Sequence, residues 1–447
     1  MSRRPHSPAG VRPSARSVAV GRLLAVEEDG AYVARLGAET TDADTARRAS
    51  DYVAGVTRLH RWLDFVIAQF YRGDVEALDP PLRQILRIGV YDLLEKGVPP
   101  HAAVGEAAGL ARSILHKGAA GLANAVLRAV SRAKEAGSLP LPDTGDPVED
   151  LAILASHPTW LVRRWLTRWG EEDVSALLAH DNRAPRYALR VTGGASASGP
   201  LLQELKTLGL RTTPSSWLDD FLTVGRLQPV IRGGFLESGR VAVQDEAAGL
   251  VVRVLDPAAG ETILDAAAAP GGKAVYAALR MGTGRVVALD VSEAKAGLVA
   301  QAAAAQNASI VETAVGDLRT WEGPADFDAV LLDAPCSGTG VLAKRADLRW
   351  RREPSDIEQL VTLQDDLLDA AARHVAPGGR LVYATCSLEP EENEERVAAF
   401  LTRHPDWRVD PVGDRVPSDV RTPEGFYAAL PHRHGTDGAF AARLIAP

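Results

Sequence analysis

The feature that most limits the fold is a regular alternation of strands and helices that begins near Phe235. Short apolar runs that end in small or acidic residues are separated by helical patterns of about 12–15 residues. Because parallel strands need a long crossover between them, this rhythm predicts a doubly wound, mostly parallel sheet. The predicted strands are Ile263–Ala266, Val286–Asp290, Phe327–Asp333 and Gly379–Thr385, and the predicted helices are Glu293–Asn307, Leu360–His374 and Glu391–His404.

The chain before this alternation divides into three parts. Residues 1–17, rich in Pro, Ser and Arg, are predicted to be a disordered tail. Residues 18–138 carry apolar side chains at three- and four-residue spacings, which predicts an all-α domain. A proline-containing linker leads to a small mixed α/β part at residues 148–234. Within that part we expect strands at Tyr187–Thr192 and Phe221–Val224, a turn at Gly193–Pro200 and a helix at Leu201–Leu208.

Composition limits the class of protein. The 447 residues leave room for about three domains, and 46% hydrophobic residues exclude disorder throughout the chain. No apolar run approaches the roughly 18–20 residues that cross a bilayer, and the N-terminus lacks the apolar core of a secretory signal, so we expect no membrane partner. Two cysteines exclude a disulfide scaffold and a multi-cysteine zinc module, and they indicate a cytoplasmic location.

The net charge of −8 is unevenly distributed. Residues 1–140 carry 19 Lys and Arg against 15 Asp and Glu, whereas residues 236–447 carry 21 against 32. The total alone argues against a nucleic-acid partner, but the mildly basic N-terminal part keeps RNA docking open. Arg greatly outnumbers Lys, which reflects either codon usage or bidentate recognition of phosphate.

A glycine-rich turn follows the first predicted strand of the sheet. Small residues there let the backbone approach a ligand at the carboxyl end of a strand, and the helix that follows offers free N–H groups. Asp290 lies 18 residues beyond Gly272, near the spacing at which an acidic residue commonly binds ribose hydroxyls. Asp317 follows another predicted strand. Each acidic residue alone is more typical of a cap or turn, but together they favour a nucleoside ligand.

The only two cysteines, Cys336 and Cys386, each follow a predicted strand and each precede a serine. Both are therefore expected at the ligand edge of one sheet. Two buried small hydrophobic residues, a disulfide and a metal pair are the alternatives. No metal is expected, because no histidine or further cysteine stands at ligand spacing.

One reaction needs these parts together. The C5 carbon of cytosine is a poor nucleophile until a thiolate adds to C6, and a proton or strong hydrogen bond at N3, which Asp333 could supply, aids that addition. Later the C5 proton is removed and the thiol is eliminated. The base must be unstacked to present its face. The residues alone do not decide which cysteine is the nucleophile.

Three motifs resemble the Sun/Fmu family of RNA cytosine-C5 methyltransferases, which use S-adenosylmethionine (SAM). They are Ala268–Lys273 (AAPGGK), Asp333–Gly340 (DAPCSGTG) and Ala384–Ser387 (ATCS). Residues 98–104 (VPPHAAV) and 117–128 (KGAAGLANAVLR) resemble a NusB-type RNA-binding domain. The resemblance implies a NusB-like helical domain at 18–138, an RNA-docking subdomain at 148–234, and a Rossmann-like methyltransferase domain with a seven-stranded doubly wound sheet at 235–447.

The resemblance also implies roles for single residues. Cys386 takes the role of nucleophile, Cys336 assists product release, and Asp333 lies between SAM and the target base. Asp290 corresponds to the ribose carboxylate and Asp317 to the residue near adenine. The loop that wraps the methionine part of SAM comprises Ala267, Ala268, Ala269, Pro270, Gly271, Gly272 and Lys273. This sequence has Ala267 where the family usually has Cys, and Ala274 where it usually has Thr.

Basic residues follow the first cysteine motif and are candidates for holding RNA phosphates: Lys344, Arg345 and Arg349. This stretch lacks the His-Pro pair usual in the family, and a solvated charged face is the alternative. The expected partner is small-subunit ribosomal RNA, and the protein is expected to be a monomer. A transfer RNA substrate and a non-catalytic RNA-binding role in ribosome assembly are the alternative functions.

Overall fold

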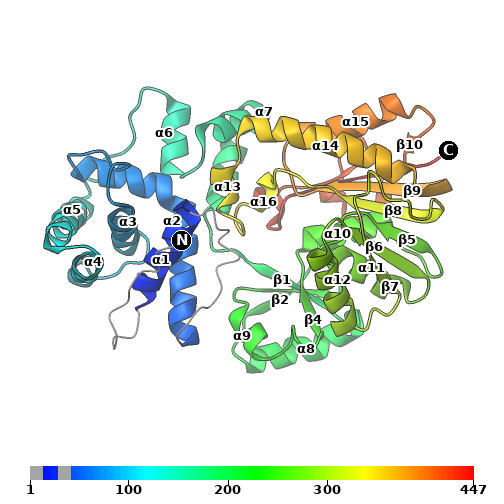
Figure 1. Cartoon of the computed structure of the whole chain (residues 1–447), viewed down its shortest axis with the longest axis horizontal. Helices are drawn as coiled ribbons and strands as arrows, with labels where there is room; N and C mark the ends of the chain where they lie inside the picture. The colour runs from blue at the N-terminus through cyan, green and yellow to red at the C-terminus, as the bar shows by residue number, and fades with distance from the viewer. Residues whose placement is uncertain (1–13, 29–41) are drawn as a thin grey trace. The chain divides into compact units, whose positions relative to one another are not determined.

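The computed structural model describes residues 14–28 and 42–447 and divides the chain into two compact units (Figure 1). The helical unit extends to Asn182 and also contains Arg345–Arg351. The α/β unit comprises Arg183–Lys344 and Arg352–Pro447. Most of the predicted disordered tail lies outside the described residues. Residues 15–17 were wrongly included in it, because they form the start of the first helix.

The helical unit is built from amphipathic helices, as the apolar spacing predicts. Asp42 caps α2 by accepting hydrogen bonds from the N–H groups of Asp44 and Thr45. Prolines occupy the first positions of α3, α4 and α6, where the missing N–H costs nothing. The helices are α1 (Ala15–Glu28), α2 (Ala43–Phe70), α3 (Pro80–Leu94), α4 (Pro100–Ile114), α5 (Lys117–Glu135), α6 (Pro147–Leu154), α7 (Thr159–Asp181) and the short α13 (Leu348–Arg351).

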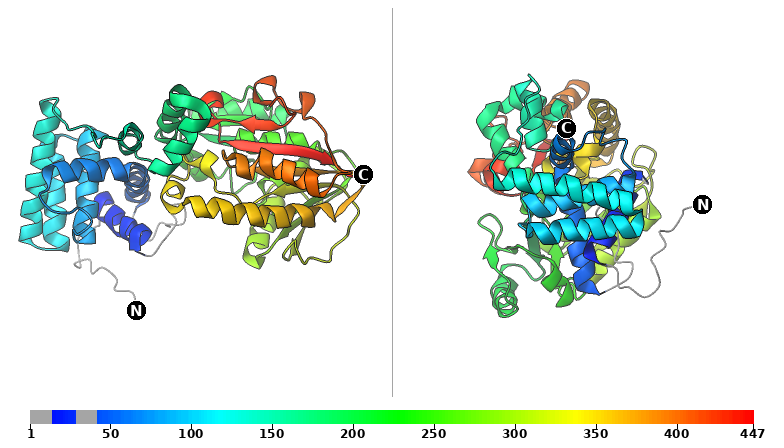
Figure 2. Two further views of the ribbon diagram at one scale, coloured as in Figure 1. Left: turned by 90° about the horizontal axis from the view of Figure 1, so that it is seen from above. Right: turned by 90° about the vertical axis from the view of Figure 1, so that its left-hand side faces the viewer.

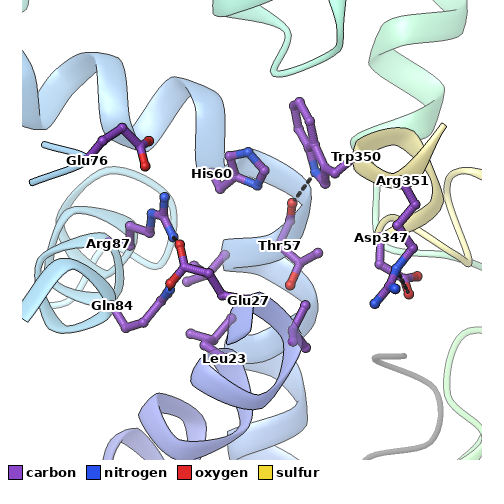
Figure 3. Close-up of a pocket in the computed structure, with 12 residues that line it drawn as sticks. Leu23, Glu27, Thr57, His60, Glu76, Gln84, Arg87, Asp347, Trp350 and Arg351 are labelled. Carbon is purple, nitrogen blue, oxygen red and sulfur yellow. Dashed lines mark hydrogen bonds and ion pairs between the residues drawn. The ribbon is translucent and has the colours of Figure 1, made fainter. Parts of the chain in front are cut away.

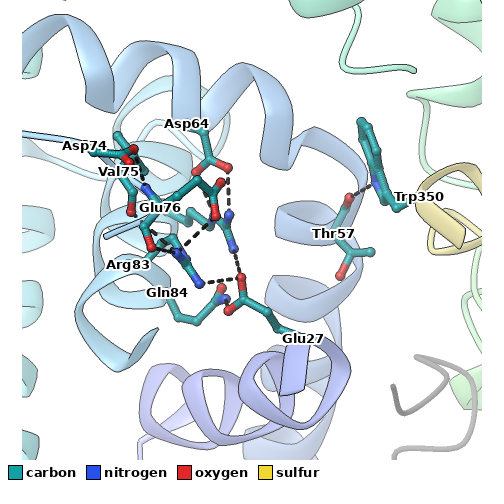
Figure 4. A network of polar contacts seen from close by, with 10 residues as sticks. Glu27, Thr57, Asp64, Asp74, Val75, Glu76, Arg83, Gln84 and Trp350 are labelled. Atoms are coloured by element: carbon teal, nitrogen blue, oxygen red, sulfur yellow. Dashed lines mark hydrogen bonds and ion pairs between the residues drawn. The ribbon is translucent and has the colours of Figure 1, made fainter. Parts of the chain in front are cut away.

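A polar network joins the first three helices of this unit (Figure 4). Glu27 of α1 accepts hydrogen bonds from Arg83 at 2.9 Å, Gln84 at 2.7 Å and Arg87 at 3.3 Å, all on α3. The Arg87 guanidinium also donates two hydrogen bonds to Asp64 of α2, at 2.7 and 2.6 Å. Arg83 and Arg87 are buried, so these charges are paired where water cannot screen them.

The α/β unit begins with a small antiparallel sheet of strand order β2-β3-β1-β4. The predicted turn at Gly193–Pro200 is confined to its first residues, because α8 begins at Ala195 and runs through Pro200. Leu201 and Leu205 of α8 are buried in the core of this part, and that packing outweighs the helix-breaking tendency of Pro200. The elements are β1 (Tyr187–Val191), α8 (Ala195–Thr207), β2 (Thr212–Pro214), β3 (Phe221–Val224), α9 (Gln228–Arg232) and β4 (Val241–Val243).

The large sheet has the strand order β10-β12-β9-β8-β5-β6-β7. The five strands from β9 to β7 pair in parallel, and β12 pairs antiparallel with β9. The predicted seven strands thus lie in line, and within the described residues an eighth strand, β11, pairs with β12. The strands are β5 (Thr262–Asp265), β6 (Arg285–Asp290), β7 (Val311–Val315), β8 (Phe327–Asp333), β9 (Val375–Thr385), β10 (Arg408–Val409), β11 (Tyr427–Ala429) and β12 (Ala439–Ile445).

Helices cover both faces of the large sheet (Figures 1 and 2). Alternate strand residues divide between two cores: Ile263 of β5 packs with α10, α11 and α12, whereas Leu264 packs with α14 and α15. In the described part of the chain, no helix combines the length and apolar character needed to cross a membrane. The helices are α10 (Glu246–Leu255), α11 (Gly272–Met281), α12 (Glu293–Ala305), α14 (Pro354–Ala372), α15 (Glu394–Arg403) and α16 (Pro431–His434).

Candidate active site

The glycine-rich loop leaves β5 and turns directly into α11, as the sequence predicts. Gly271 adopts a φ of +103°, and a side-chain Cβ there would lie 3.1 Å from the Cα of Val299. Only glycine therefore permits this turn without strain. The N-terminus of α11 presents N–H groups at the same edge of the sheet, which suits a carboxylate such as that of methionine.

Asp265, the last residue of β5, carries a buried carboxylate at the base of this loop. The residue is 2% exposed, and within the described residues its carboxylate forms no ion pair and accepts no hydrogen bond from a side chain. Burial, reinforced by the charge of Asp333, raises the pKa of Asp265 to about 7. A buried carboxylate without a counter-ion beside free N–H groups fits a ligand with both a cation and an anion, and the amino-acid end of SAM has both.

Asp290 and Asp317 lie at the ends of the next two strands of the sheet. Asp290 accepts hydrogen bonds from the N–H groups of Ala269 and Ser292, each at 3.3 Å, so it borders the glycine-rich loop. Asp317 lies two residues beyond β7, and the hydrogen bond from Arg319 lowers the pKa of its carboxyl. The structure thus brings both acidic residues to the predicted edge, with Asp317 already paired to a neighbour.

Asp333 ends β8 and forms an ion pair with a residue of the loop. The Lys273 ammonium donates a 2.6 Å hydrogen bond to Asp333. Burial works against the Lys273 charge, but the charge of Asp333 outweighs it and raises the pKa of Lys273. This pair therefore provides a carboxylate, fixed in position by its ion pair, and a proton donor between the glycine-rich loop and the cysteines.

The two cysteines lie next to each other just beyond the ends of β8 and β9. The sulfur atoms of Cys336 and Cys386 are 3.2 Å apart, and the N–H of Cys386 points to the sulfur of Cys336 at 3.4 Å. The N–H of Gly340 donates to the Cys386 carbonyl at 3.0 Å, where a Cβ would lie 2.7 Å from that oxygen. The hydrogen bond with Cys386, followed by burial, raises the pKa of Cys336 well above its ordinary value.

The three basic residues predicted to hold RNA differ in their surroundings. Lys344 pairs with Asp245 and, at 3.0 Å, with Asp437. Although burial opposes its charge, these two carboxylates raise the pKa of Lys344. Arg345 is exposed and remains a candidate for phosphate.

Arg349 is a correction to the predicted RNA contacts. It is 1% exposed inside the helical unit, and its guanidinium donates to the carbonyls of Ser156 and Asp181 at 3.1 Å and to the Asn182 side chain at 2.8 Å. Burial lowers the pKa of Arg349 to about 10. A guanidinium used in this way has no surface to offer to phosphate, so Arg349 supports the fold.

The residue after Arg349 lines a pocket of about 360 Å³ within the helical unit (Figure 3). The Trp350 indole stacks on His60, with ring centroids 3.9 Å apart, and donates a 2.7 Å hydrogen bond to the Thr57 carbonyl. Acidic side chains outnumber basic ones in its wall. The pocket is therefore not the electropositive surface that RNA phosphates need.

Reasoning from the sequence missed two residues of this site as functional candidates. Asp265 falls inside the predicted strand Ile263–Ala266 without an assigned role, and burial without a counter-ion is the property that singles it out. Glu392 is fully buried between the two cysteine loops. Its only sequence signal is a position in the acidic run that follows Cys386, and such runs are usually solvated surface.

Known proteins resemble this chain in each of its parts. The sequence model of the family described as 16S rRNA methyltransferase RsmB/F matches residues 252–445, that of the NusB family matches 13–132, and that of an RsmF/B-like ferredoxin-like domain matches 157–231. A probable ribosomal RNA small subunit methyltransferase B from Bacillus subtilis is 34% identical over 97% of this chain and 99% of its own length. The chain belongs to the RsmB/F family.

Other RsmB/F relatives and solved structures agree with this assignment. The ribosomal RNA small subunit methyltransferase B of Cronobacter sakazakii is 34% identical, covering 88% of each chain. The crystal structure of PH0851 superposes with a TM-score of 0.77 at 27% identity, covering 96% of this chain and 97% of its own. A methyltransferase homolog from Pyrococcus horikoshii has a TM-score of 0.56 at 26% identity, over 68% and 100% of the two chains.

These findings confirm the family resemblance, the fold class and the methyltransferase activity class. They also agree with SAM as the cofactor, and Asp265, which has no counter-ion within the described residues and lies beside the glycine-rich loop, is the feature of this chain that fits it.

Proposed function

We propose that this protein methylates C5 of a cytosine in small-subunit ribosomal RNA, with Cys386 as the nucleophile. The observation that carries the proposal is the 3.2 Å approach of the only two thiols in the chain, beside the Asp333–Lys273 pair. The names of the RsmB/F relatives support ribosomal rather than transfer RNA as the substrate.

The cofactor would be held by the loop from Ala267 to Lys273, with Asp265 toward its amino group and Asp290 toward its ribose. SAM supplies an electrophilic methyl group bonded to a positively charged sulfur. The site must then supply a carbon nucleophile, and a cytosine ring becomes one only after addition of a thiolate.

In the first step the Cys386 thiolate forms a bond from its sulfur to C6, and the ring electrons move toward N3. Asp333 delivers a proton or a strong hydrogen bond to N3, with the Lys273 ammonium bound to it as the proton source, and this neutralises the electron pair that arrives at N3. C5 then carries the electron pair that accepts the methyl group. Cys336 assists product release as the base: its thiolate takes the C5 proton, the C5–H electron pair re-forms the C5–C6 double bond, and the C6–S bond breaks to release the Cys386 thiolate. The N3 proton then returns to the Asp333–Lys273 pair.

The test uses the full chain, labelled SAM and unmodified small-subunit ribosomal RNA transcribed in vitro. We expect label in 5-methylcytidine after digestion to nucleosides, and a loss of at least about 10³-fold in Cys386→Ala. Cys336→Ala is the matched control, because it removes the adjacent thiol and should leave a covalent RNA–protein adduct on a denaturing gel. Label in another nucleoside, or an active Cys386→Ala protein, would contradict the proposal.

A further inference from the structure

A fully buried carboxylate lies between the two cysteine loops and has no role in the chemistry described so far. Glu392 is 0% exposed and ends the short 3-10 helix η3 (Pro390–Glu392). One oxygen accepts hydrogen bonds from the N–H of Ser337 at 2.8 Å and from the Gln364 amide at 3.0 Å. The other accepts from the hydroxyls of Ser337 and, at 2.5 Å, Ser387.

The serines bound by this carboxylate are the residues that directly follow the two cysteines. Ser337 follows Cys336 and Ser387 follows Cys386, and the two serine hydroxyls are 3.1 Å apart. The ladder between β8 and β9 ends at Asp333 and Ala384. Beyond that point both thiols are on loops, so Glu392 ties the two loops together where the strands no longer do.

The backbone of Glu392 is itself firmly held. The Tyr383 hydroxyl of β9 donates to the Glu392 carbonyl at 2.6 Å. The next residue, Asn393, accepts from the Thr385 hydroxyl at 2.5 Å and donates to the Ser387 carbonyl at 3.0 Å. Glu392 and the serine hydroxyls bound to it form a clamp. This clamp is anchored on β9, which leads into the Cys386 loop, and it reaches across to the loop that carries Cys336.

The electrostatics of Glu392 are unusual for a buried carboxylate. Within the described residues, no Lys, Arg or His forms an ion pair with it, and its four hydrogen bonds come from neutral donors. Four is the number a carboxylate can accept, so its bonding capacity is filled. A buried charge without a cation is costly, and packing alone would be served by a neutral side chain. The negative charge of Glu392 also contributes to the raised pKa of Cys336, after the larger effects of Cys386 and burial.

We propose that Glu392 is a positioning residue that holds Cys336 and Cys386 at the mutual distance and orientation needed for thiol addition and elimination. The inference rests on the proposed function for its catalytic consequence, but the geometry it asserts can be tested without RNA or SAM.

The first experiment measures the alignment of the two thiols directly. Because the chain contains only two cysteines, the bifunctional thiol reagent dibromobimane, which fluoresces after both of its ends have reacted, reports their proximity in the full-length protein. We expect Glu392→Gln to slow cross-linking about fivefold or more. The matched control is Glu395→Gln, an exposed glutamate on α15, which should cross-link at the wild-type rate.

The second experiment measures methyl transfer by the same proteins. Glu392→Gln should lower kcat by about 10- to 100-fold, because a small misplacement of reacting groups costs that much. KM for RNA and the Kd of SAM should stay within about twofold of wild type, since no role in binding is assigned to Glu392. If wild-type protein makes no 5-methylcytidine, the proposed function fails while the cross-linking result still decides the positioning role.

If Glu392→Gln does not fold, as judged by thermal unfolding, Ser337→Ala and Ser387→Ala replace it. Each removes one hydroxyl from the clamp, and both should slow cross-linking. Unchanged cross-linking in Glu392→Gln, or in either serine variant where these replace it, overturns the proposal. A loss of kcat accompanied by unchanged cross-linking also overturns it.

Discussion

Two buried clusters, one in each unit, balance charge in opposite ways. In the helical unit, Glu27 and Asp64 face the guanidinium groups of Arg83 and Arg87, so anions meet cations within one network. In the α/β unit, Asp265 is buried with no ion-pair partner among the described residues, and Glu392 is held by neutral donors. A buried carboxylate that is paired with cations stabilises the fold. A buried carboxylate without a cation destabilises it, and a bound ligand or a reaction can offset that free-energy cost. The lack of a counter-ion singles out Asp265 and Glu392 as functional candidates, whereas Asp333 is a candidate because its pair with Lys273 lies beside the cysteines.

Among these carboxylates, the largest effect is expected at Asp333, which is both paired and assigned to the reaction. Asp333→Asn removes the charge beside Lys273, and methyl transfer should fall by about 10²- to 10⁴-fold because N3 loses its acid–base partner. Label transfer to ribosomal RNA measures this. Asp366→Asn, an exposed change on α14, is the control. Equal activity in the two variants would place Asp333 with the structural carboxylates.

Asp265→Asn should move stability and binding in opposite directions. The pKa of Asp265 is about 7 in the folded protein and about 4 in the unfolded chain. Between these values the unfolded chain has lost the proton that the folded protein keeps, so the free energy of unfolding falls as pH rises from 4 to 7. Asparagine does not titrate, so Asp265→Asn should not show this fall in the free energy of unfolding.

We therefore compare the free energy of unfolding of Asp265→Asn with that of wild type. As pH rises from 4.5 to 8, this difference should shift in favour of the variant by an amount on the order of 2–4 kcal/mol. Urea unfolding without SAM measures it, and calorimetry should show at least about tenfold weaker SAM binding. A difference in stability that does not change with pH would mean that Asp265 is ordinarily ionised, and the contrast with Glu27 would be lost.

Glu27→Gln should affect stability alone. The change leaves the buried Arg83 and Arg87 with less compensation, and we expect a loss of about 1–3 kcal/mol in urea unfolding with kcat within about twofold of wild type. Glu76→Gln is the control, because Glu76 pairs with the same Arg83 but its side chain is 72% exposed. The control should cost less than about 0.5 kcal/mol. A tenfold fall in kcat for Glu27→Gln would show that Glu27 also affects methyl transfer, which contradicts a purely structural role.

The smallest effect is expected for a single phosphate contact. Arg345→Ala should weaken RNA binding about two- to fivefold and reduce the slope of log affinity against log salt by about one. Arg349→Lys should leave that slope unchanged and lower the free energy of unfolding, because Arg349 binds carbonyls inside the helical unit. Filter binding at several salt concentrations separates the two. If Arg349→Lys reduced the salt dependence of RNA affinity as much as Arg345→Ala, Arg349 would have to be counted among the residues that contact RNA.

The sequence predicted best where the signal is local and repeated. The strands Phe221–Val224 and Phe327–Asp333 occur with the predicted bounds, because an apolar run between polar turns is sufficient to define them. The parallel sheet follows from the alternation of elements, and it brings together two cysteines that are 50 residues apart.

What the sequence could not predict depends on contacts distant along the chain. The helix through Pro200 exists because Leu201 and Leu205 find a core. Arg349 looked like a surface cation because its carbonyl partners lie more than 160 residues away. The clamp at Glu392 depends on the serine after each cysteine, and an acidic run gives no hint of which carboxylate turns inward.

Arg345–Arg351 belongs to the helical unit, although the residues on both sides of it belong to the α/β unit. The two units therefore cannot be separated by a single cut in the chain. The chain passes from one unit to the other three times, so a cut after Asn182 does not yield two complete fragments. A truncation that begins at residue 183 would take Arg349 and Trp350 away from the carbonyls that they bind. Recombination at that boundary would cause the same loss, although each unit has its own core.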